Sequence, residues 1–456
     1  MDLFGTAGIR GDARETVTPS LAQRVGQAAA ADAREEAEDD DVEFVVARDG
    51  RETGQALVDA MASGLASAGA DVVEVGQAPT PALAYASQGR YGVVLTASHN
   101  PPEANGIKLF VDGEEYGGAA EARIEGRIAD GVEPTVWDEW GGRESATVLE
   151  NYREAVVEYA EGFGANLDGL RIVVDCGNGM AGLATPQVLR ELGAHVVTLN
   201  GNVDGHFPGR GSKPTGETLG DCIRFLKDGD FDLGIAHDGD ADRIVVLTGD
   251  GKVVHEDTVL AMLAEEYVSA TESDDPAIVT TPNASARIDE RVRAAGGRVE
   301  RVALGYLHDG IADARAGGAD VAFAAEPWKH VHTRFGGWID GVASAAVLAR
   351  LVAETPLDER REPIRERPYR KVSVPCPDDA KVDAMARLTE TLPDRFPEAS
   401  VDDEYGIRLE LPDASWVLVR PSGTEPYLRI YAESDDVETL SEAAKTVVED
   451  AISAAE

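Results

Sequence analysis

The sequence has 456 residues, and its 84 acidic against 42 basic side chains give a formal net charge of −42. This length predicts several domains, and the charge argues against nucleic acid or an anionic membrane as a partner, because phosphate groups would be repelled. We expect an acid-rich solvated surface of the kind that halophilic proteins carry.

Targeting features are missing from the sequence. No apolar run approaches the ~20 residues of a membrane span, and "MDLFGTAGIRG" has neither the basic start nor the apolar core of a signal peptide. The three cysteines form neither a metal-binding spacing nor a disulfide framework. A cytoplasmic protein without a membrane partner is therefore expected.

Three segments repeat the order strand, loop, helix, turn, strand. They are residues 42–76, 170–200 and 276–303. In each, a β-branched run precedes a helical period, which predicts right-handed βαβ units in largely parallel sheets. After each unit one more strand ends at polar residues, namely Ser98, the Asp238–Asp242 cluster and Glu326. Ligands of open α/β sheets collect at such strand ends.

The last part of the chain has another pattern. Strand-like runs such as "RKVSVPCP" and "YLRIYAES" alternate with helical periods near 380–392 and 437–454, and the charged, proline-punctuated segment 354–369 indicates a linker. We predict three similar α/β domains with mixed, largely parallel sheets plus a smaller α+β C-terminal domain. The expected domains are residues 1–150, 151–255, 256–368 and 369–456.

The stretch "VLTASHNPPEANGIKL" (94–109) places Ser98 after an apolar run. Taken alone, Ser98 is best explained as a turn residue. The stretch lacks the G-x-S-x-G pattern of hydrolases. With a cation site elsewhere in the chain, transfer of a phosphoryl group through the serine oxygen becomes attractive, because that chemistry needs positioning, a metal and positive charge.

The stretch "HDGDADR" (237–243) is the strongest metal signal. Asp238, Asp240 and Asp242 alternate, so a tight loop can turn three carboxylates toward one hard cation such as Mg²⁺ or Ca²⁺. An EF-hand is excluded because Arg243 and Gly249 stand where its glycine and bidentate glutamate belong. A haloacid-dehalogenase-type site is disfavoured by the position in the fold and by the residue after D-x-D. A solvated acidic turn remains the plain alternative.

Two further stretches carry arginines. "RPSGTEPYLRIYAE" (420–433) has two arginines around S-G-T, whose hydroxyl and backbone N–H groups can bind an anion, so we predict a phosphate site there. "FGTAGIRG" (4–11) displays Arg10 on a glycine-rich loop and is weak evidence by itself. In "ARDGRETG" (47–54), Arg48, Asp49 and Arg51 stand at a strand end and are expected to form structural ion pairs.

Taken together, these motifs resemble the α-D-phosphohexomutase superfamily, which includes phosphoglucomutase, phosphomannomutase and phosphoglucosamine mutase. "FGTAGIRG" resembles the family's opening loop, "TASHNPPEANGIK" its phosphoserine loop, "DGDADR" its metal loop and "RPSGTEPYLRIY" its phosphate loop. The likeness covers essentially the whole chain in the expected order. It implies four domains around a central cleft, which in order carry the phosphoserine, bind the metal, bind the sugar and bind phosphate.

The resemblance also implies residue roles. Ser98 would be phosphorylated in the resting enzyme, and Mg²⁺ would be bound by the Ser98 phosphate with Asp238, Asp240 and Asp242. Arg243 would hold the phosphoserine. Proton transfer would be assisted by Lys108 and Arg10, with His99 nearby. The substrate's existing phosphate would be held by Arg420, Ser422, Gly423, Thr424 and Arg429.

The sugar-reading loop departs from the family's common G-E-x-S-G-H and reads "AEPWKH" (325–330). Glu326 and His330 keep their spacing as substrate-binding residues, but Trp328 and Lys329 stand where Ser-Gly would be. The added bulk makes a smaller sugar, such as a pentose phosphate, a real alternative. A second departure, Ala7 for the usual Asp or Ser, is expected to be minor.

The implied activity is that of a phosphosugar mutase, which moves a phosphoryl group between the C1 and C6 (or C5) hydroxyls through phosphoserine and a bisphosphate intermediate. A sugar bisphosphate would serve as activator, and the chain is expected to be a monomer or homodimer. The alternatives are a Mg-dependent sugar-phosphate phosphatase and a non-catalytic sugar-phosphate-binding paralogue.

Overall fold

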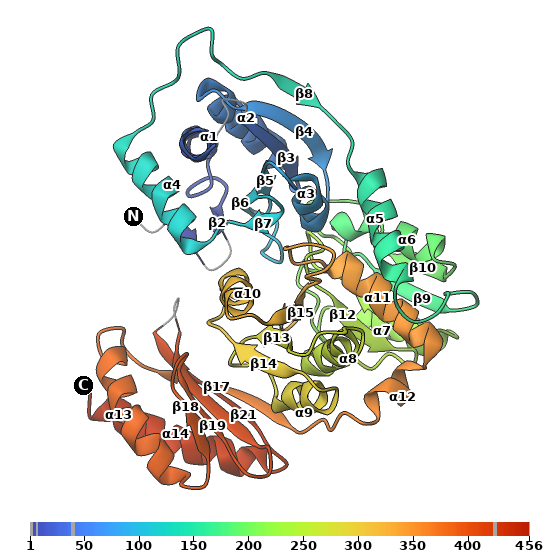
Figure 1. The fold of residues 1–456 in the computed structure, drawn as a ribbon, viewed down its shortest axis with the longest axis vertical. Helices are drawn as coiled ribbons and strands as arrows, with labels where there is room; N and C mark the ends of the chain where they lie inside the picture. Colours follow the sequence, from blue (N-terminus) through green and yellow to red (C-terminus); the bar gives the residue numbers. More distant parts are fainter. Residues whose placement is uncertain (1–2, 6–7, 38–41, 423–425, 456) are drawn as a thin grey trace. The chain divides into compact units, whose positions relative to one another are not determined.

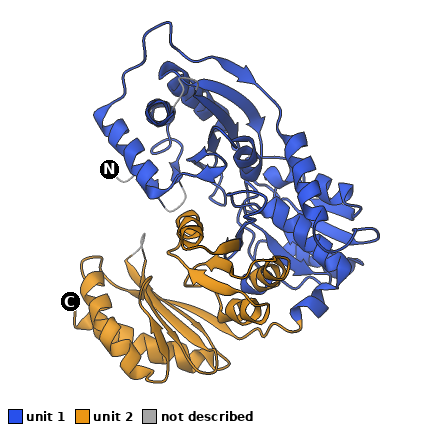
Figure 2. Ribbon diagram, in the orientation of Figure 1, with its two compact units in different colours: residues 1–259, 322–361 blue, residues 260–321, 362–456 orange. Residues whose placement is uncertain are grey.

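The computed structural model describes residues 3–5, 8–37, 42–422 and 426–455. By its internal contacts the chain divides into two compact units, which Figure 2 shows in two colours. Unit 1 comprises Met1–Val259 and Ala322–Arg361, and unit 2 comprises Leu260–Val321 and Glu362–Glu456. Both units are therefore discontinuous in sequence.

The first sheet of unit 1 has eight strands, ordered β1-β2-β6-β5-β3-β4-β8, with β7 paired to β6 (Figure 1). They are β1 (Phe4–Gly5), β2 (Gly8–Asp12), β3 (Glu43–Arg48), β4 (Asp71–Gln77), β5 (Tyr91–Leu95), β6 (Ala104–Val111), β7 (Glu114–Glu115) and β8 (Arg143–Ser145). The β3 strand is parallel to β4 and β5, as the βαβ pattern predicts, whereas β6 returns antiparallel to β5. The loop between β5 and β6 carries Ser98.

Four helices accompany this sheet. They are α1 (Pro19–Glu36), α2 (Gly54–Ser67), α3 (Thr80–Ala86) and α4 (Gly118–Asp130). The α1 helix begins where the Thr18 hydroxyl accepts a hydrogen bond from the Leu21 N–H at 3.3 Å, just before a proline that suits the first turn. Small residues let α1 approach α2 closely, because a Cβ added at Gly64 would lie 2.2 Å from the Gln23 carbonyl oxygen.

The second sheet of unit 1 has four strands in the order β10-β9-β11-β12. They are β9 (Arg171–Asp175), β10 (His195–Leu199), β11 (Leu233–Ala236) and β12 (Val245–Thr248). The β9 strand is parallel to β10 and β11, and β12 is antiparallel to β11. The acidic loop of residues 237–243 therefore follows a buried parallel strand.

Further elements complete unit 1. They are α5 (Leu149–Glu161), the 3-10 helix Met180–Leu183, α6 (Thr185–Glu191), α7 (Gly220–Asp228), the start of α8 (Glu256–Ser269), most of β15 (Asp320–Glu326), β16 (Lys329–Val331), α11 (Gly341–Glu354) and α12 (Leu357–Arg361). The β15 and β16 strands form an antiparallel hairpin with Glu326 opposite Lys329. The segment predicted as a plain linker thus contains a short helix, α12, whose Leu357 is buried.

Unit 2 starts with a parallel pair and ends with an antiparallel sheet. The first part has β13 (Pro276–Thr280), β14 (Arg298–Arg301), α9 (Ala286–Ala294) and α10 (Leu307–Ala316). The second part is the sheet β17-β21-β20-β19-β18, and Figure 1 shows both of its helices on one face. Its elements are β17 (Tyr369–Pro375), α13 (Lys381–Arg395), β18 (Ser400–Asp402), β19 (Ile407–Glu410), β20 (Trp416–Pro421), β21 (Tyr427–Glu433) and α14 (Val437–Ser453).

This architecture confirms the predicted fold class of α/β segments with mixed sheets and a small α+β C-terminal part. The proposed boundaries at residues 150, 255 and 368 stay predictions. Among the described residues, no helix is long and apolar enough to cross a membrane.

Candidate active site

Ser98 lies in a tight, buried bend directly after β5. The residue is 0% exposed, its φ is +49°, and its N–H donates to the Thr96 hydroxyl at 3.0 Å. The left-handed backbone turns the side chain toward the acidic loop, where Ser98 Oγ donates to Asp238 Oδ2 at 2.6 Å. The structure therefore joins the two strongest sequence signals, 140 residues apart, through one hydrogen bond.

Asp238, Asp240 and Asp242 are all buried in the loop between β11 and β12, and one oxygen from each lies within 4.8 Å of the others. Ala241 turns this loop with a φ of +62°. Asp240 is held from another element, because the Thr80 hydroxyl at the start of α3 donates to Asp240 Oδ2 at 2.7 Å.

The donor set fits a hard divalent cation. Among the described residues, Oδ1 of Asp240 and Oδ1 of Asp242 are buried without any hydrogen-bond partner. Buried carboxylate oxygens are costly to leave unsatisfied, and carboxylates are the ligands that Mg²⁺ prefers. This buried three-aspartate group is therefore able to bind a metal.

Lys108 on β6 supplies buried positive charge to the acidic loop. Its Nζ lies 3.2 Å from Asp242 Oδ2 and 3.8 Å from Glu115 Oε2. Burial alone would lower the pKa of Lys108, but the carboxylates of Glu115 and Asp242 raise the pKa above its ordinary value. Lys108 therefore stays a cation in this environment.

Arg243 ends the acidic loop as a second cation. Its Nε lies 3.7 Å from Asp238 Oδ2 and 3.7 Å from Asp242 Oδ1. Burial would raise the pKa of Asp242, but the nearby cations, first Lys108 and then Arg243, Lys329 and Arg10, hold that pKa below its ordinary value. Burial raises the pKa of Asp238, with help from the neighbouring carboxylates. The pKa values of Asp238 and Asp242 are thus shifted in opposite directions within one loop.

His99 follows the serine, and its Nδ1 lies 3.3 Å from Ser98 Oγ. Burial lowers the pKa of His99 to about 3, and the charges of Arg243, Arg10 and Lys213 act in the same direction. The ring is therefore neutral at physiological pH and lies within hydrogen-bonding distance of the serine oxygen.

Arg51 organises the serine loop, a role that the sequence did not reveal. Its guanidinium donates to the carbonyl oxygens of Ser98 at 3.0 Å and Asn100 at 2.8 Å. It also donates to the carbonyls of Pro101 and Ala104, and pairs with Asp49 at 2.9 Å. The expected ion pair is confirmed for Asp49 and Arg51, and the same arginine also fastens the loop backbone. Arg48, predicted with them, donates hydrogen bonds to Gln55 and to the Asp49 carbonyl.

The metal loop and the loop 200–218 pack directly on the serine loop. A Cβ added at Gly239 would lie 2.6 Å from the Ser98 carbonyl oxygen, so only glycine allows this approach. From the other loop, the Ser212 hydroxyl donates to the Asn100 carbonyl at 2.8 Å, and the Phe207 ring lies 5.2 Å from the Arg51 guanidinium carbon.

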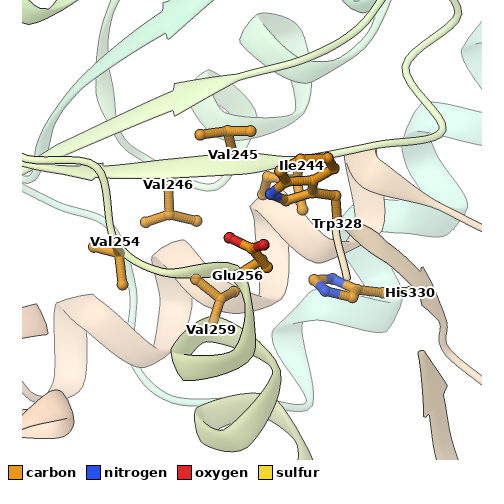
Figure 3. Close-up of a pocket in the computed structure, with 8 residues that line it drawn as sticks. All are labelled: Ile244, Val245, Val246, Val254, Glu256, Val259, Trp328 and His330. Carbon is orange, nitrogen blue, oxygen red and sulfur yellow. The ribbon is translucent and has the colours of Figure 1, made fainter. Parts of the chain in front are cut away.

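The loop predicted to read the sugar forms the turn of the β15–β16 hairpin. Lys329 Nζ lies 3.3 Å from Glu326 Oε2, and Trp328 has a φ of +71°. His330 is buried, and its Nδ1 lies 3.0 Å from the Ser344 hydroxyl. Figure 3 shows His330 and Trp328 at one hollow with Glu256.

The predicted phosphate loop belongs to unit 2. Arg420 and Arg429 lie directly opposite each other on β20 and β21, and Ser422 is held by a hydrogen bond from its N–H to the Tyr427 carbonyl at 2.9 Å. Like charges opposite one another destabilise a sheet unless an anion joins them. Gly423 and Thr424, which were predicted with this loop, lie outside the described residues.

Contacts and electrostatics within unit 1 bring together most of the predicted residues. They are Ser98, His99, Lys108, Asp238, Asp240, Asp242, Arg243 and Arg10, with Glu326 and His330 on the nearby hairpin. The sequence missed Arg51, Thr80 and Lys213. The available signal for Arg51 was its spacing from Asp49. The two opposite charges stand two residues apart, directly after a buried strand.

Models of three family domains match the chain. They are described as "Phosphoglucomutase/phosphomannomutase, alpha/beta/alpha domain I" over residues 1–134, the corresponding domain II over 150–251, and the C-terminal domain over 372–450.

Curated relatives match over nearly the full length. "Phosphopentomutase" of Thermococcus kodakarensis is 40% identical and covers 95% of this chain and 94% of its own. "Probable phosphoglucosamine mutase" of Methanopyrus kandleri is 42% identical, with 96% and 95% covered. A solved phosphoglucomutase/phosphomannomutase family protein from Burkholderia thailandensis superposes with a TM-score of 0.86 at 29% identity, covering 100% of this chain and 97% of that one.

The chain therefore belongs to the phosphoglucomutase/phosphomannomutase family of the α-D-phosphohexomutase superfamily. It is an intramolecular phosphotransferase of the isomerase class, a phosphosugar mutase.

Proposed function

We propose that this mutase moves a phosphoryl group between the C1 hydroxyl and the C5 or C6 hydroxyl of a sugar phosphate, with Ser98 as the carrier. The observation that carries the proposal is the 2.6 Å hydrogen bond between Ser98 Oγ and Asp238, inside a buried group of three carboxylates. Serine, acidic loop and cations are the parts that phosphoryl transfer requires.

The burial of Ser98 supports a carrier that keeps its phosphate. The serine is 0% exposed and its loop is fastened by Arg51. Exclusion of water favours transfer to a sugar hydroxyl over hydrolysis. A mutase must return the second phosphate to the same oxygen, so a fixed serine serves both half-reactions.

Asp238, Asp240 and Asp242 are the proposed ligands of Mg²⁺, together with the phosphate on Ser98. Their unpartnered oxygens and close spacing support this assignment. When bound, Mg²⁺ supplies charge neutralisation for the phosphoryl oxygens. A sugar bisphosphate stays our proposed activator.

The cations have distinct proposed tasks. Lys108, whose pKa is raised by its carboxylate neighbours although burial opposes this, holds its proton and donates it as a hydrogen bond to phosphoryl oxygens. Arg243 binds the phosphoserine, with Arg10 beside it. Neutral His99 orients the serine oxygen at 3.3 Å. In addition, Lys108 and Arg10 are proposed to assist proton transfer.

Arg420, Ser422 and Arg429 are proposed to bind the substrate's existing phosphate. The side-by-side placement of two arginines on β20 and β21 supports this, because an arginine pair binds phosphate with two planar donor groups. Glu326 and His330 are the proposed sugar contacts. The sugar itself is a hexose or pentose phosphate, as the names of the two relatives illustrate.

The experiment combines intact mass with a coupled assay. Purified protein should carry one phosphate, and Ser98→Ala should lose both that phosphate and isomerisation, whereas Ser63→Ala, an exposed serine on α2, should keep both. Removal of divalent cations by a chelator should abolish turnover, and added Mg²⁺ should restore it. Full activity of Ser98→Ala would overturn the carrier role.

Two other outcomes separate the alternatives. Release of free phosphate without isomerised sugar would identify a phosphatase. Thermal stabilisation by sugar phosphates without any turnover would identify a binding paralogue.

A further inference from the structure

The acidic loop that carries the three aspartates lies beyond the end of a strand ladder. The last paired residues of β11 and β12 are Ala236 and Val245, so residues 237–244 are not held by that ladder. Three buried carboxylates lie close together in this loop, and like charges repel one another strongly in a buried setting. Other contacts must therefore keep the loop closed.

His237 makes such a contact across the loop. Its ring Nδ1 lies 2.7 Å from the carbonyl oxygen of Arg243, at the other end of the loop. A carbonyl can only accept, so Nδ1 carries a ring proton and donates it. The Arg243 N–H is bound from the same end of the loop, because it donates to Asp238 Oδ1 at 3.3 Å. Side chains at the loop start thus bind both backbone groups of Arg243.

The ring of His237 is also fixed on its other side. Its Nε2 lies 3.1 Å from the hydroxyl of Thr185, the first residue of α6. The histidine is 0% exposed, so both ring nitrogens find their partners inside the protein. A buried ring bound at both nitrogens has a defined orientation.

The backbone of His237 is bound as well. Its N–H donates to the Asp175 carbonyl at the end of β9 at 3.1 Å, and its own carbonyl accepts from the Arg210 guanidinium at 2.6 Å. Arg210 is in turn paired with Asp175 at 2.9 Å. Every polar group of His237 thus has a partner, and the residue ties the acidic loop to the ends of β9 and α6.

We propose that His237 is a positioning residue for the metal site. This inference rests on the proposed function, because the side chains that it positions belong to the proposed Mg²⁺ ligands. By holding Arg243 at the loop start, His237 keeps Asp238 and Asp242 on either side of the Arg243 guanidinium, whose Nε lies 3.7 Å from each carboxylate. Without the ring contact, repulsion between the carboxylates spreads the loop. Residues behind metal ligands typically contribute about 10–100-fold to metal affinity.

The test compares three replacements of His237 in the full-length protein. Phenylalanine keeps a ring without the hydrogen bond, asparagine places an amide N–H at the position of Nδ1, and glutamine places it one bond farther out. Binding of Mn²⁺ alone, followed by electron paramagnetic resonance, should weaken about tenfold or more in His237→Phe and His237→Gln. His237→Asn should stay within about threefold of wild type, because it restores the donor to Arg243.

The control is His195→Phe, which changes an exposed histidine of β10 and should bind Mn²⁺ as wild type does. Intact mass matches the samples for phosphate on Ser98, so a difference in phosphorylation does not mimic the effect. Wild-type affinity in His237→Phe, or equal losses in the phenylalanine and asparagine variants, would overturn the positioning role.

The ring tautomer gives a second readout that requires neither metal nor turnover. In protein with isotope-labelled histidine, NMR should show an exchange-protected Nδ1–H signal for His237, identified by its disappearance in His237→Asn. A ring protonated only at Nε2 would overturn the contact with Arg243. If wild type binds no Mn²⁺, the metal assignment of the proposed function is overturned and the metal role of His237 with it. A Mn²⁺ site that is lost in Asp240→Asn but unchanged in His237→Phe would overturn this inference alone.

Discussion

Arg51 is fully buried and donates a 3.0 Å hydrogen bond to the carbonyl oxygen of Ser98. One side chain thus binds four backbone carbonyls of the bend that presents the serine, in addition to the bend's own backbone hydrogen bonds. The charge itself is balanced by Asp49 at 2.9 Å. The position of Ser98 therefore depends on a residue that takes no part in chemistry.

Replacing Arg51 with Met should destabilise the protein and abolish turnover. The change leaves Asp49 buried without its partner and removes the donors for the loop carbonyls, which should lower the free energy of unfolding by about 3–5 kcal/mol. Denaturant unfolding measures the loss. Arg48→Met removes a neighbouring arginine bonded to Gln55 on the surface and should cost less than about 1 kcal/mol. Equal losses in the two variants would contradict the role of Arg51.

Gly239→Ala should reduce kcat while the protein stays folded. The added methyl group would lie 2.6 Å from the Ser98 carbonyl oxygen, so the metal loop and serine loop must move apart. A misplacement of about 1 Å can cost on the order of 100-fold in rate. The matched control is Gly216→Ala, where a Cβ meets nothing within 4 Å. Steady-state kinetics over a range of Mg²⁺ concentrations would show the difference, and wild-type rates in Gly239→Ala would refute it.

Buried His330 should make the protein less stable as the pH falls. Burial lowers the pKa of His330 to about 3, whereas an unfolded histidine titrates near 6.5. The unfolded chain therefore binds a proton that the folded chain does not, and stability is lost as pH falls from about 6.5 toward 3. The slope is about 1.4 kcal/mol per pH unit for one histidine. Denaturation at several pH values should show that the free energy of unfolding falls less steeply with pH in His330→Asn than in wild type. His195→Gln changes an exposed histidine and should keep the wild-type slope.

The excess of acidic residues should make the protein more stable in concentrated salt. A formal net charge of −42 produces self-repulsion that is screened as the Debye length falls from about 10 Å at 0.1 M to about 3 Å at 1 M salt. We expect the melting temperature to rise by several degrees between 0.1 and 2 M KCl. Sucrose at matched osmolality controls for general exclusion effects. A melting temperature that falls with KCl would show that attractive ion pairs dominate instead.

The sequence offered Ser98 and Asp238 as candidates at strand ends for a physical reason, and the family resemblance implied that they act together. Both follow buried strands that run parallel to a neighbour, and the carboxyl ends of such strands collect functional groups. Alternating aspartates and a serine before two prolines are also visible as local patterns. The α/β class followed from the same alternation of β-branched runs and helical periods.

The partners of Arg51 and the position of Lys213 could not be predicted. Arg51 binds backbone carbonyls, and a carbonyl carries no residue identity that a pattern can show. Lys213 lies in a loop without regular elements, so neither helical nor strand periodicity fixes its direction. The strain at Trp328 was likewise hidden, although its place in the sugar-reading loop was seen.

The order in which the two units appear along the chain has a consequence for synthesis. Unit 1 leaves off at Val259 and resumes at Ala322, and the hairpin with Glu326 and Trp328 belongs to the returning piece. At 5–20 residues per second, the ribosome needs roughly 5–20 s to pass from Val259 to Arg361. During that time the serine and its aspartates emerge before the β15–β16 hairpin. A nascent chain stalled in this interval would hold Ser98 and the three aspartates without the hairpin that carries Glu326 and Trp328.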